Sequence, residues 1–183
     1  MVTPIEFTVE DLRGLLTELG ERLAAEGVHG EIYVVGGAAL ALEYDERRTT
    51  ADIDAVLRPE TTIRTIAAAM GEERGLPPNW INSSAAAFVP GGDPGTVILD
   101  LPGVAVAVAA PEHLLAMKMA SYRPGQDQAD LELLFTELGI ASAEEAADLA
   151  LTVYGEHTVV LPDRPELLLS AEAILDRLER RRR

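Results

Sequence analysis

The stretch that decides the fold runs from residue 32 to residue 57 and reads IYVVGGAALALEYDERRTTADIDAVL. It opens with a β-branched run at 32–35, which ends at the glycine pair Gly36 and Gly37. An apolar segment from about 38 to 44 follows with the spacing of a helix. The pattern predicts a strand, a tight turn and a short helix, in that order.

The start of this helix is a candidate phosphate site. The first N–H groups of a helix lack partners within it and lie at the positive end of its dipole, so they suit an anion. Gly36 and Gly37 would let a phosphate approach the main chain closely. A glycine pair by itself is more often a plain turn, and the chain has neither the dinucleotide fingerprint nor a Gly-Lys-Ser/Thr phosphate loop.

Two aspartates, Asp52 and Asp54, flank Ile53 at the head of the next apolar run. Because residues two apart in a strand point to the same face, both carboxylates should project from one side of it. Like charges on a partly buried strand repel each other and lose hydration unless a cation lies between them. The usual occupant is a divalent metal such as Mg²⁺, which binds carboxylates together with substrate phosphates. We therefore predict the active site here.

Two neighbouring features can be interpreted in two ways. The loop 47–50, which reads RRTT and ends at Thr50, is either a solvated loop or a set of groups that hold a phosphate tail. Asp100 ends the first of two predicted strands, 96–101 and 104–108. It is either the third carboxylate of a metal site or the polar residue that opens the turn between these strands.

Composition narrows the class of protein. The 183 residues, of which 48% are hydrophobic, can form one domain or one domain with an appendage. With no cysteine, disulfides and thiolate metal sites are excluded. No apolar run reaches the roughly 18 residues that span a bilayer, and an acidic helix stands where a signal peptide would be basic and then apolar. We expect a cytoplasmic protein without a membrane partner.

Charge limits the partners further. A net charge of −16 argues against nonspecific DNA binding, although a nucleotide or an RNA end at one local basic patch remains compatible with it. Of the 15 lysines and arginines only one is a lysine, Lys118, and hydrophobic residues flank it in a predicted helix at about 111–122. It is either a leftover surface lysine or a compact ammonium placed at a phosphate, a role in which arginine is not equivalent.

The order strand, glycine turn, helix, loop and acidic strand resembles the nucleotidyltransferase superfamily related to DNA polymerase β. The signature of that superfamily is a glycine turn followed by an Asp-x-Asp pair on a strand. Gly36, Gly37, Asp52 and Asp54 match it position by position.

A second motif adds specificity. The run LLAMK at 114–118, followed by Arg123, Asp127 and Asp130 at helical intervals, resembles the Lys-Arg-Asp-Asp segment of bacterial toxin-type nucleotidyltransferases, which include the abortive-infection family. The segment LPPNWIN at 76–82 is similar to the same group. The resemblance covers roughly residues 33–154.

The resemblance implies an α+β fold: a nucleotidyltransferase-type mixed β-sheet flanked by helices over 1–110, followed by a helical region over 111–183 that packs on this core. It implies that Asp52 and Asp54 bind Mg²⁺, with Asp100 as the candidate third ligand. It implies that Lys118 neutralises charge on the triphosphate as pyrophosphate leaves. The implied nucleotide-binding residues are Gly36, Gly37, Thr50, Arg123, Asp127 and Asp130. For the last three, a local ion network on the helix surface is the alternative.

The leading hypothesis is a magnesium-dependent nucleotidyltransferase that moves a nucleoside monophosphate from an NTP to a hydroxyl on a tRNA 3′ end or a protein side chain. Toxin-type relatives suggest that it is the toxin of a toxin–antitoxin pair, with an antitoxin as partner. The alternative is a catalytically inactive protein of the same fold that binds or regulates a partner, for which the negative charge suits a basic surface. A hydrolase that uses paired carboxylates at a metal has less support.

Overall fold

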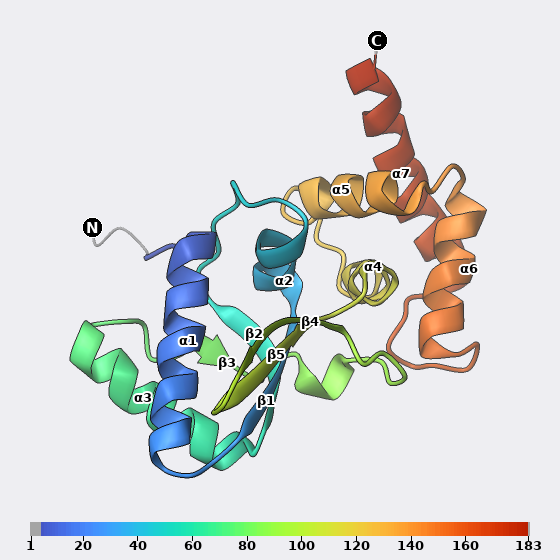
Figure 1. Ribbon diagram of the computed structural model, residues 1–183. Coiled ribbons are helices and arrows are strands. Elements are labelled where there is room, and N and C mark those ends of the chain that lie inside the picture. The colour runs from blue at the N-terminus through green and yellow to red at the C-terminus, as the bar shows by residue number, and fades with distance from the viewer. Residues whose placement is uncertain (1–4, 183) are drawn as a thin grey trace. The chain divides into compact units, whose positions relative to one another are not determined.

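The computed structural model describes residues 5–182. These residues divide into two compact units, 5–87 with 94–109 and 88–93 with 110–182. Within the described residues, the first unit contains a five-stranded mixed sheet with three α-helices, and the second contains four α-helices (Figure 1). The predicted α+β class is confirmed.

The sheet has the strand order β3-β2-β1-β5-β4. Its strands are β1 Gly30–Val35, β2 Ile53–Arg58, β3 Ile81–Asn82, β4 Thr96–Leu101 and β5 Val104–Val108. The central strand β1 runs antiparallel to β2 and parallel to β5, while β3 runs parallel to β2 and β4 antiparallel to β5. The two strands predicted at 96–101 and 104–108 are confirmed as the hairpin β4–β5.

Helices cover one face of this sheet. The helices of the first unit are α1 Val9–Ala25, α2 Gly36–Glu43 and α3 Glu60–Arg74, and a 3₁₀ turn, η1 Ala86–Phe88, follows β3. Helices α1 and α3 contact each other and the sheet, and they lie on the same side of it (Figure 1). The side chains of Val34, Ala55 and Val106 on that side are completely buried, whereas Tyr33, Val56 and other residues of the opposite face are partly exposed. The opposite face is therefore more accessible at Tyr33 and Val56 than the face under α1 and α3 is.

The hairpin β4–β5 packs against α1 at a glycine. A Cβ atom at Gly103 would overlap the carbonyl oxygen of Gly20 and would lie 2.6 Å from the backbone nitrogen of Ala24. Gly103→Ala should therefore push α1 off the hairpin and lower the free energy of unfolding by about 1–3 kcal/mol, as overpacking does. Gly14→Ala, in the same helix but with nothing within 4 Å of the added carbon, should instead raise stability by up to about 1 kcal/mol. Urea unfolding of both variants checks this, and equal effects would contradict the packing described.

The second unit is a bundle of α4 Pro111–Ala120, α5 Gln128–Leu138, α6 Ala143–Tyr154 and α7 Arg164–Arg182. Alanines 146, 147 and 150 of α6 are fully buried, which lets α6 contact both α4 and α7. On α5, the buried carboxylate of Glu132 pairs with Arg177 at 2.6 Å and Arg181 at 2.8 Å, both from α7. Two arginines near the C-terminus are thus used inside this unit.

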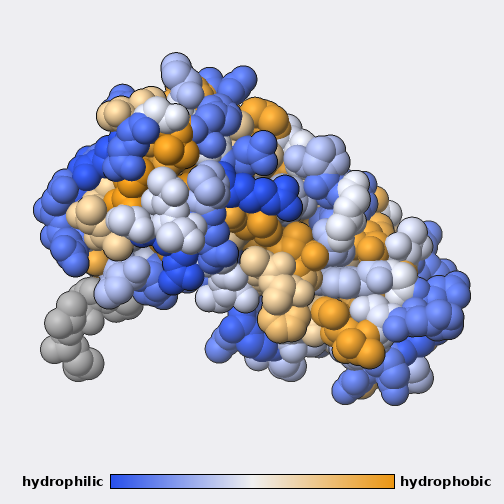
Figure 2. Space-filling model, turned by 90° about the horizontal axis from the view of Figure 1, so that it is seen from below, coloured by the Kyte–Doolittle hydropathy of each residue, from blue (hydrophilic) through white to orange (hydrophobic). Residues whose placement is uncertain are grey.

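Figure 2 shows one face of the molecule, on which hydrophilic residues surround several separate hydrophobic patches. Among residues 5–182, no helix is both long enough and apolar enough to cross a membrane.

Candidate active site

The acidic pair lies at the start of β2. Asp54 is the second residue of β2, whereas Asp52 lies immediately before the first residue of the strand, Ile53. The sequence pattern suggests instead that both aspartates belong to the strand. Ile53 and Ala55 are completely buried on the side of α1 and α3, and alternation therefore turns Asp54 to the open face. Both aspartates are partly exposed. They are available to a ligand without being fully hydrated.

Asn82, on the strand next to β2, links Asp52 to the face of the sheet on which Asp54 lies. It pairs in register with Asp54, so the two side chains project from the same side of adjacent strands. Its amide Nδ2 donates a hydrogen bond to Oδ2 of Asp52 at 3.1 Å. Sequence reasoning gave Asn82 no role, and the only signal for it is its position at the end of the segment 76–82 that carries part of the resemblance.

The glycine turn lies directly against Asp54. Gly36 has a φ of +66°, a conformation that glycine adopts without strain. A Cβ atom added there would be 3.5 Å from Oδ2 of Asp54, and one added at Gly37 would be 3.2 Å from Oγ1 of Thr50. Thr50 in turn donates from Oγ1 to the carbonyl of Asp52 at 3.1 Å. The structure thus brings five of the predicted site residues together: Gly36, Gly37, Thr50, Asp52 and Asp54.

The first turn of α2 begins without a side-chain cap from the residue before it, which is Val35. The turn therefore presents backbone donors and the positive end of the helix dipole next to two carboxylates. Carboxylates and helix N-termini are the groups that bind Mg²⁺ and phosphate respectively, so these residues fit a metal-bound nucleotide.

The electrostatic state of Asp52 agrees with this fit. Burial raises the pKa of the Asp52 carboxyl, and the hydrogen bond from Asn82 offsets part of the rise. The charged form is thus incompletely stabilised by the protein, and a cation beside it would be favourable. Over residues 5–182, no group of three or more His, Asp or Glu side chains is placed to hold a metal ion. Within that range the pair would share its cation with substrate oxygens.

Asp100 is not brought to this pair. Asp100 pairs with Ala105 of β5, and Ala105 pairs with Glu31 of β1, whereas Asp54 pairs with Val35 at the other end of β1. At the usual spacings of a sheet this separates Asp100 from Asp54 by about 13 Å along the strands and about 14 Å across them. One metal ion cannot bridge that distance, because metal–oxygen bonds are only about 2–2.6 Å long. We leave Asp100 out of the site.

Lys118 lies in an ion network of the second unit. Its Nζ atom is 2.8 Å from Asp127 and 2.7 Å from Asp130, and Arg123 contacts Asp127 at 3.1 Å. Only 15% of the lysine side chain is exposed, with 3% for Asp127 and 9% for Asp130. These residues do not lie on one helix: Lys118 is in α4, Arg123 in the connecting loop, and Asp127 immediately precedes α5. The network thus brings together two positive and two negative side chains.

The pKa of Asp127 yields a pH prediction. Burial alone would raise it, but hydrogen bonds from Arg123 and Lys118 outweigh burial and hold it below 3.8. The folded chain therefore keeps Asp127 ionised at a pH where the unfolded chain already binds a proton. The stability that Asp127 contributes is complete above about pH 4 and is lost as pH falls through the lowered pKa.

Urea unfolding of wild type and Asp127→Asn checks this. The difference in free energy of unfolding between the two proteins should be constant from about pH 7 to 5 and should shrink below about pH 4. A difference that grows on acidification would contradict this assignment.

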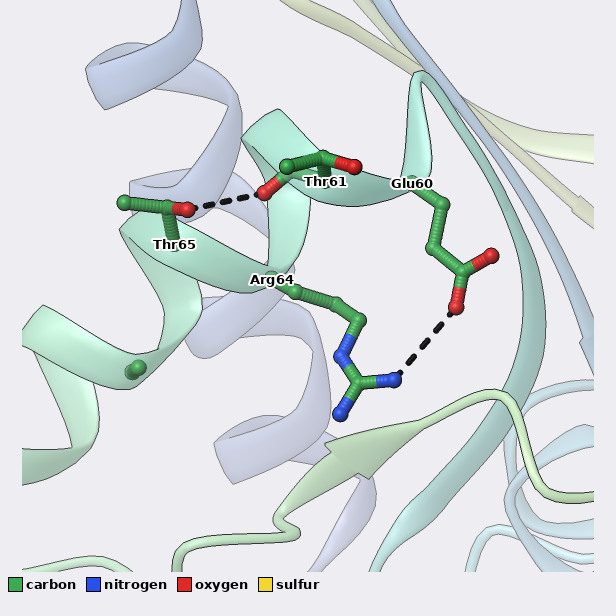
Figure 3. Close-up of a pocket in the computed structure, with 5 residues that line it drawn as sticks. Glu60, Thr61, Arg64 and Thr65 are labelled. Atoms are coloured by element: carbon green, nitrogen blue, oxygen red, sulfur yellow. Dashed lines mark hydrogen bonds and ion pairs between the residues drawn. The ribbon is translucent and has the colours of Figure 1, made fainter.

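A shallow hollow of about 560 Å³ lies on α3, apart from the acidic pair. It is lined by Glu60, Thr61, Arg64, Thr65 and Ala68. Figure 3 shows that Arg64 turns toward Glu60, at 3.4 Å, and that Thr65 is bonded back to its own helix at Thr61. Both contacts lie within α3, and we assign the hollow no function.

Comparison with known proteins gives one match. A family model described as a nucleotidyltransferase of unknown function (DUF6036) matches residues 10–141. The matched range contains the glycine turn, the acidic pair and the Lys118 network. No curated protein and no solved structure matches the chain.

Proposed function

The chain belongs to this family of nucleotidyltransferases of unknown function, and from that premise we propose that it transfers a nucleoside monophosphate from an NTP to a hydroxyl acceptor in a Mg²⁺-dependent reaction. The observation that carries the proposal is the proximity of Asp54 to the Gly36 turn, where an added Cβ atom would lie 3.5 Å from Oδ2 of Asp54, with Asp52 hydrogen-bonded to Asn82 on the neighbouring strand. This is the arrangement of donors and acceptors that a metal-bound triphosphate requires.

Each group of the chain has a defined task in this reaction. Asp52 and Asp54 would hold Mg²⁺, which when bound offsets charge that develops on the phosphate oxygens. Backbone N–H groups at the start of α2 would bind phosphate oxygens and fix the triphosphate in place. The acceptor oxygen would form a bond to the α-phosphorus and release its proton to solvent, while the bond from the α-phosphorus to the departing pyrophosphate breaks. Positioning and electrostatics dominate such a transfer, and both are supplied here by fixed groups.

Lys118, Arg123, Asp127 and Asp130 enter the proposal by the sequence resemblance. The role it suggests for Lys118 is to neutralise charge on the triphosphate, while Arg123, Asp127 and Asp130 would hold Lys118 or contact the nucleotide. The ion network described above supports the holding role, since it fixes the ammonium between two carboxylates.

The acceptor and the setting also follow from the resemblance to toxin-type enzymes. We propose a tRNA 3′ end or a protein side chain as acceptor, and an antitoxin protein as the partner that restrains the activity. An NTP substrate and a chain without cysteine fit the cytoplasm.

The experiment is incubation with each α-labelled NTP, Mg²⁺ and either tRNA or a cytosolic protein fraction. Label should appear in one acceptor class and should be lost when Mg²⁺ is chelated. Transfer that survives chelation or the Asp52→Ala, Asp54→Ala double substitution would remove the proposed site.

A second candidate is an inactive protein of the same fold that binds or regulates a partner. The observation that favours it is that Asn82, and not a third acid, adjoins the pair on β3, and that no group of three His, Asp or Glu side chains among residues 5–182 could hold a metal ion. Calorimetric titration with NTP and Mg²⁺ separates the two candidates. Binding supports the enzyme, whereas the absence of any heat of binding favours the regulatory protein.

A further inference from the structure

Asn82 is a buried polar residue whose role is not explained by the fold alone. The buried polar and charged side chains among the described residues are Asn82, Asp127, Asp130 and Glu132, and the last three belong to the second unit. Asn82 is 8% exposed and lies at the end of β3, an edge strand of only two residues. A buried amide at such a position must be held by specific partners, because an unpaired one is costly.

The partners fix which way the amide faces. The backbone N–H of Ser84 donates to Oδ1 of Asn82 at 2.9 Å, which leaves Nδ2 on the side of Asp52. Nδ2 then donates to Asp52 at 3.1 Å and approaches the carbonyl of Asn79 at 3.5 Å. A carboxylate at position 82 could still accept from Ser84, but its second oxygen would face the Asp52 carboxylate.

We propose that Asn82 is a positioning residue of the metal site, which orients Asp52 and occupies the place where a third carboxylate would otherwise adjoin the pair. This inference rests on the proposed function. Its hydrogen bond directs Oδ2 of Asp52 toward the amide and leaves Oδ1 for the cation. The cation is then held by two protein charges, and the remaining charge comes from the triphosphate.

Two substitutions separate this role from a purely structural one. Asn82→Ala removes the donor and leaves Asp52 free to rotate, and the loss of such a supporting partner typically weakens metal binding by about 10–100-fold. Asn82→Asp keeps the shape but sets three carboxylates together, which repel unless a cation is present. The aspartate variant should therefore be less stable without metal and should gain more from metal than the wild type.

The experiment is titration of Mn²⁺ without nucleotide, with free Mn²⁺ followed by electron paramagnetic resonance, together with thermal unfolding with and without Mg²⁺. Asn82→Ala should bind Mn²⁺ at least about tenfold more weakly than wild type. Asn82→Asp should bind at least as tightly as wild type and show a larger rise of its unfolding temperature on addition of Mg²⁺. Asn79→Ala, which alters an exposed side chain nearby and keeps the carbonyl, serves as the control and should match wild type.

The outcomes are distinguishable. If wild type binds no Mn²⁺, the proposed function itself fails. If wild type binds Mn²⁺ but Asn82→Ala binds it equally well, or Asn82→Asp gains no more stability from Mg²⁺ than wild type does, only the role of Asn82 is overturned.

Discussion

Replacement of both Asp52 and Asp54 with asparagine is expected to lower nucleotidyl transfer by at least about 100-fold. Asparagine keeps the size of each side chain and removes both charges, so the change acts on the cation and not on packing. A bound metal contributes several kcal/mol to a phosphoryl-type transfer, and each 1.36 kcal/mol corresponds to about tenfold in rate. The rate of label transfer from an α-labelled NTP is the measurement.

Asp100→Asn is the matched control for this pair. It removes the same kind of charge from the same sheet, but the register places it at the opposite end of the strands from Asp54. Its transfer rate should equal that of wild type. A slow Asp100→Asn variant, or an active double variant, would contradict the site described.

Lys118→Ala is expected to lower the free energy of unfolding by about 3–5 kcal/mol. The substitution leaves Asp127 and Asp130 facing each other in a buried setting without the ammonium that lies between them. Breaking a buried ion pair by removal of one partner has costs of this size. Urea unfolding followed by far-UV circular dichroism measures the loss.

The control for Lys118 is an ion pair of the surface. Arg64→Ala removes the partner of Glu60 on α3, where both side chains are more than half exposed. Its cost should stay below about 1 kcal/mol. If Lys118→Ala unfolds like wild type and yet loses transfer, the ion network is not what fixes Lys118, and a direct role at the triphosphate gains support.

Much of the fold follows from local signals in the sequence. The hairpin of residues 96–108 was predictable because two apolar runs flank a Pro-Gly turn, and these fix both strand ends. The strand, turn and helix around Gly36 were also predictable. A β-branched run ends at the two glycines, and apolar residues with helical spacing follow them. The proximity of Asp54 to that turn also follows once the two strands pair as neighbours.

The rest depends on pairings between distant residues. Asp100 carries the right chemistry for a metal, and only the register of β4 against β5, and of β5 against β1, separates it from Asp54. Asn82 is not acidic, so its residue type gives no sign of a metal site. It joins the site because the two-residue strand β3 pairs with β2 residues that lie 28 positions earlier in the chain. The sequence spacing also suggests that Arg123, Asp127 and Asp130 lie on a helix. In the structure Asp127 lies just before α5, and it bonds to Lys118 of α4 across the connecting loop.

The central claim is that a divalent cation binds between the Gly36 turn and the acidic pair. Substoichiometric Mn²⁺ in a ¹⁵N-labelled sample tests it directly, because the paramagnetic ion broadens the amide signals nearest to it. The account predicts that the signals of Gly36, Gly37 and Asp54 broaden first in wild type and stay sharp in the Asp52→Asn, Asp54→Asn variant. Broadening that begins elsewhere in the chain, or that is unchanged in the variant, would contradict it.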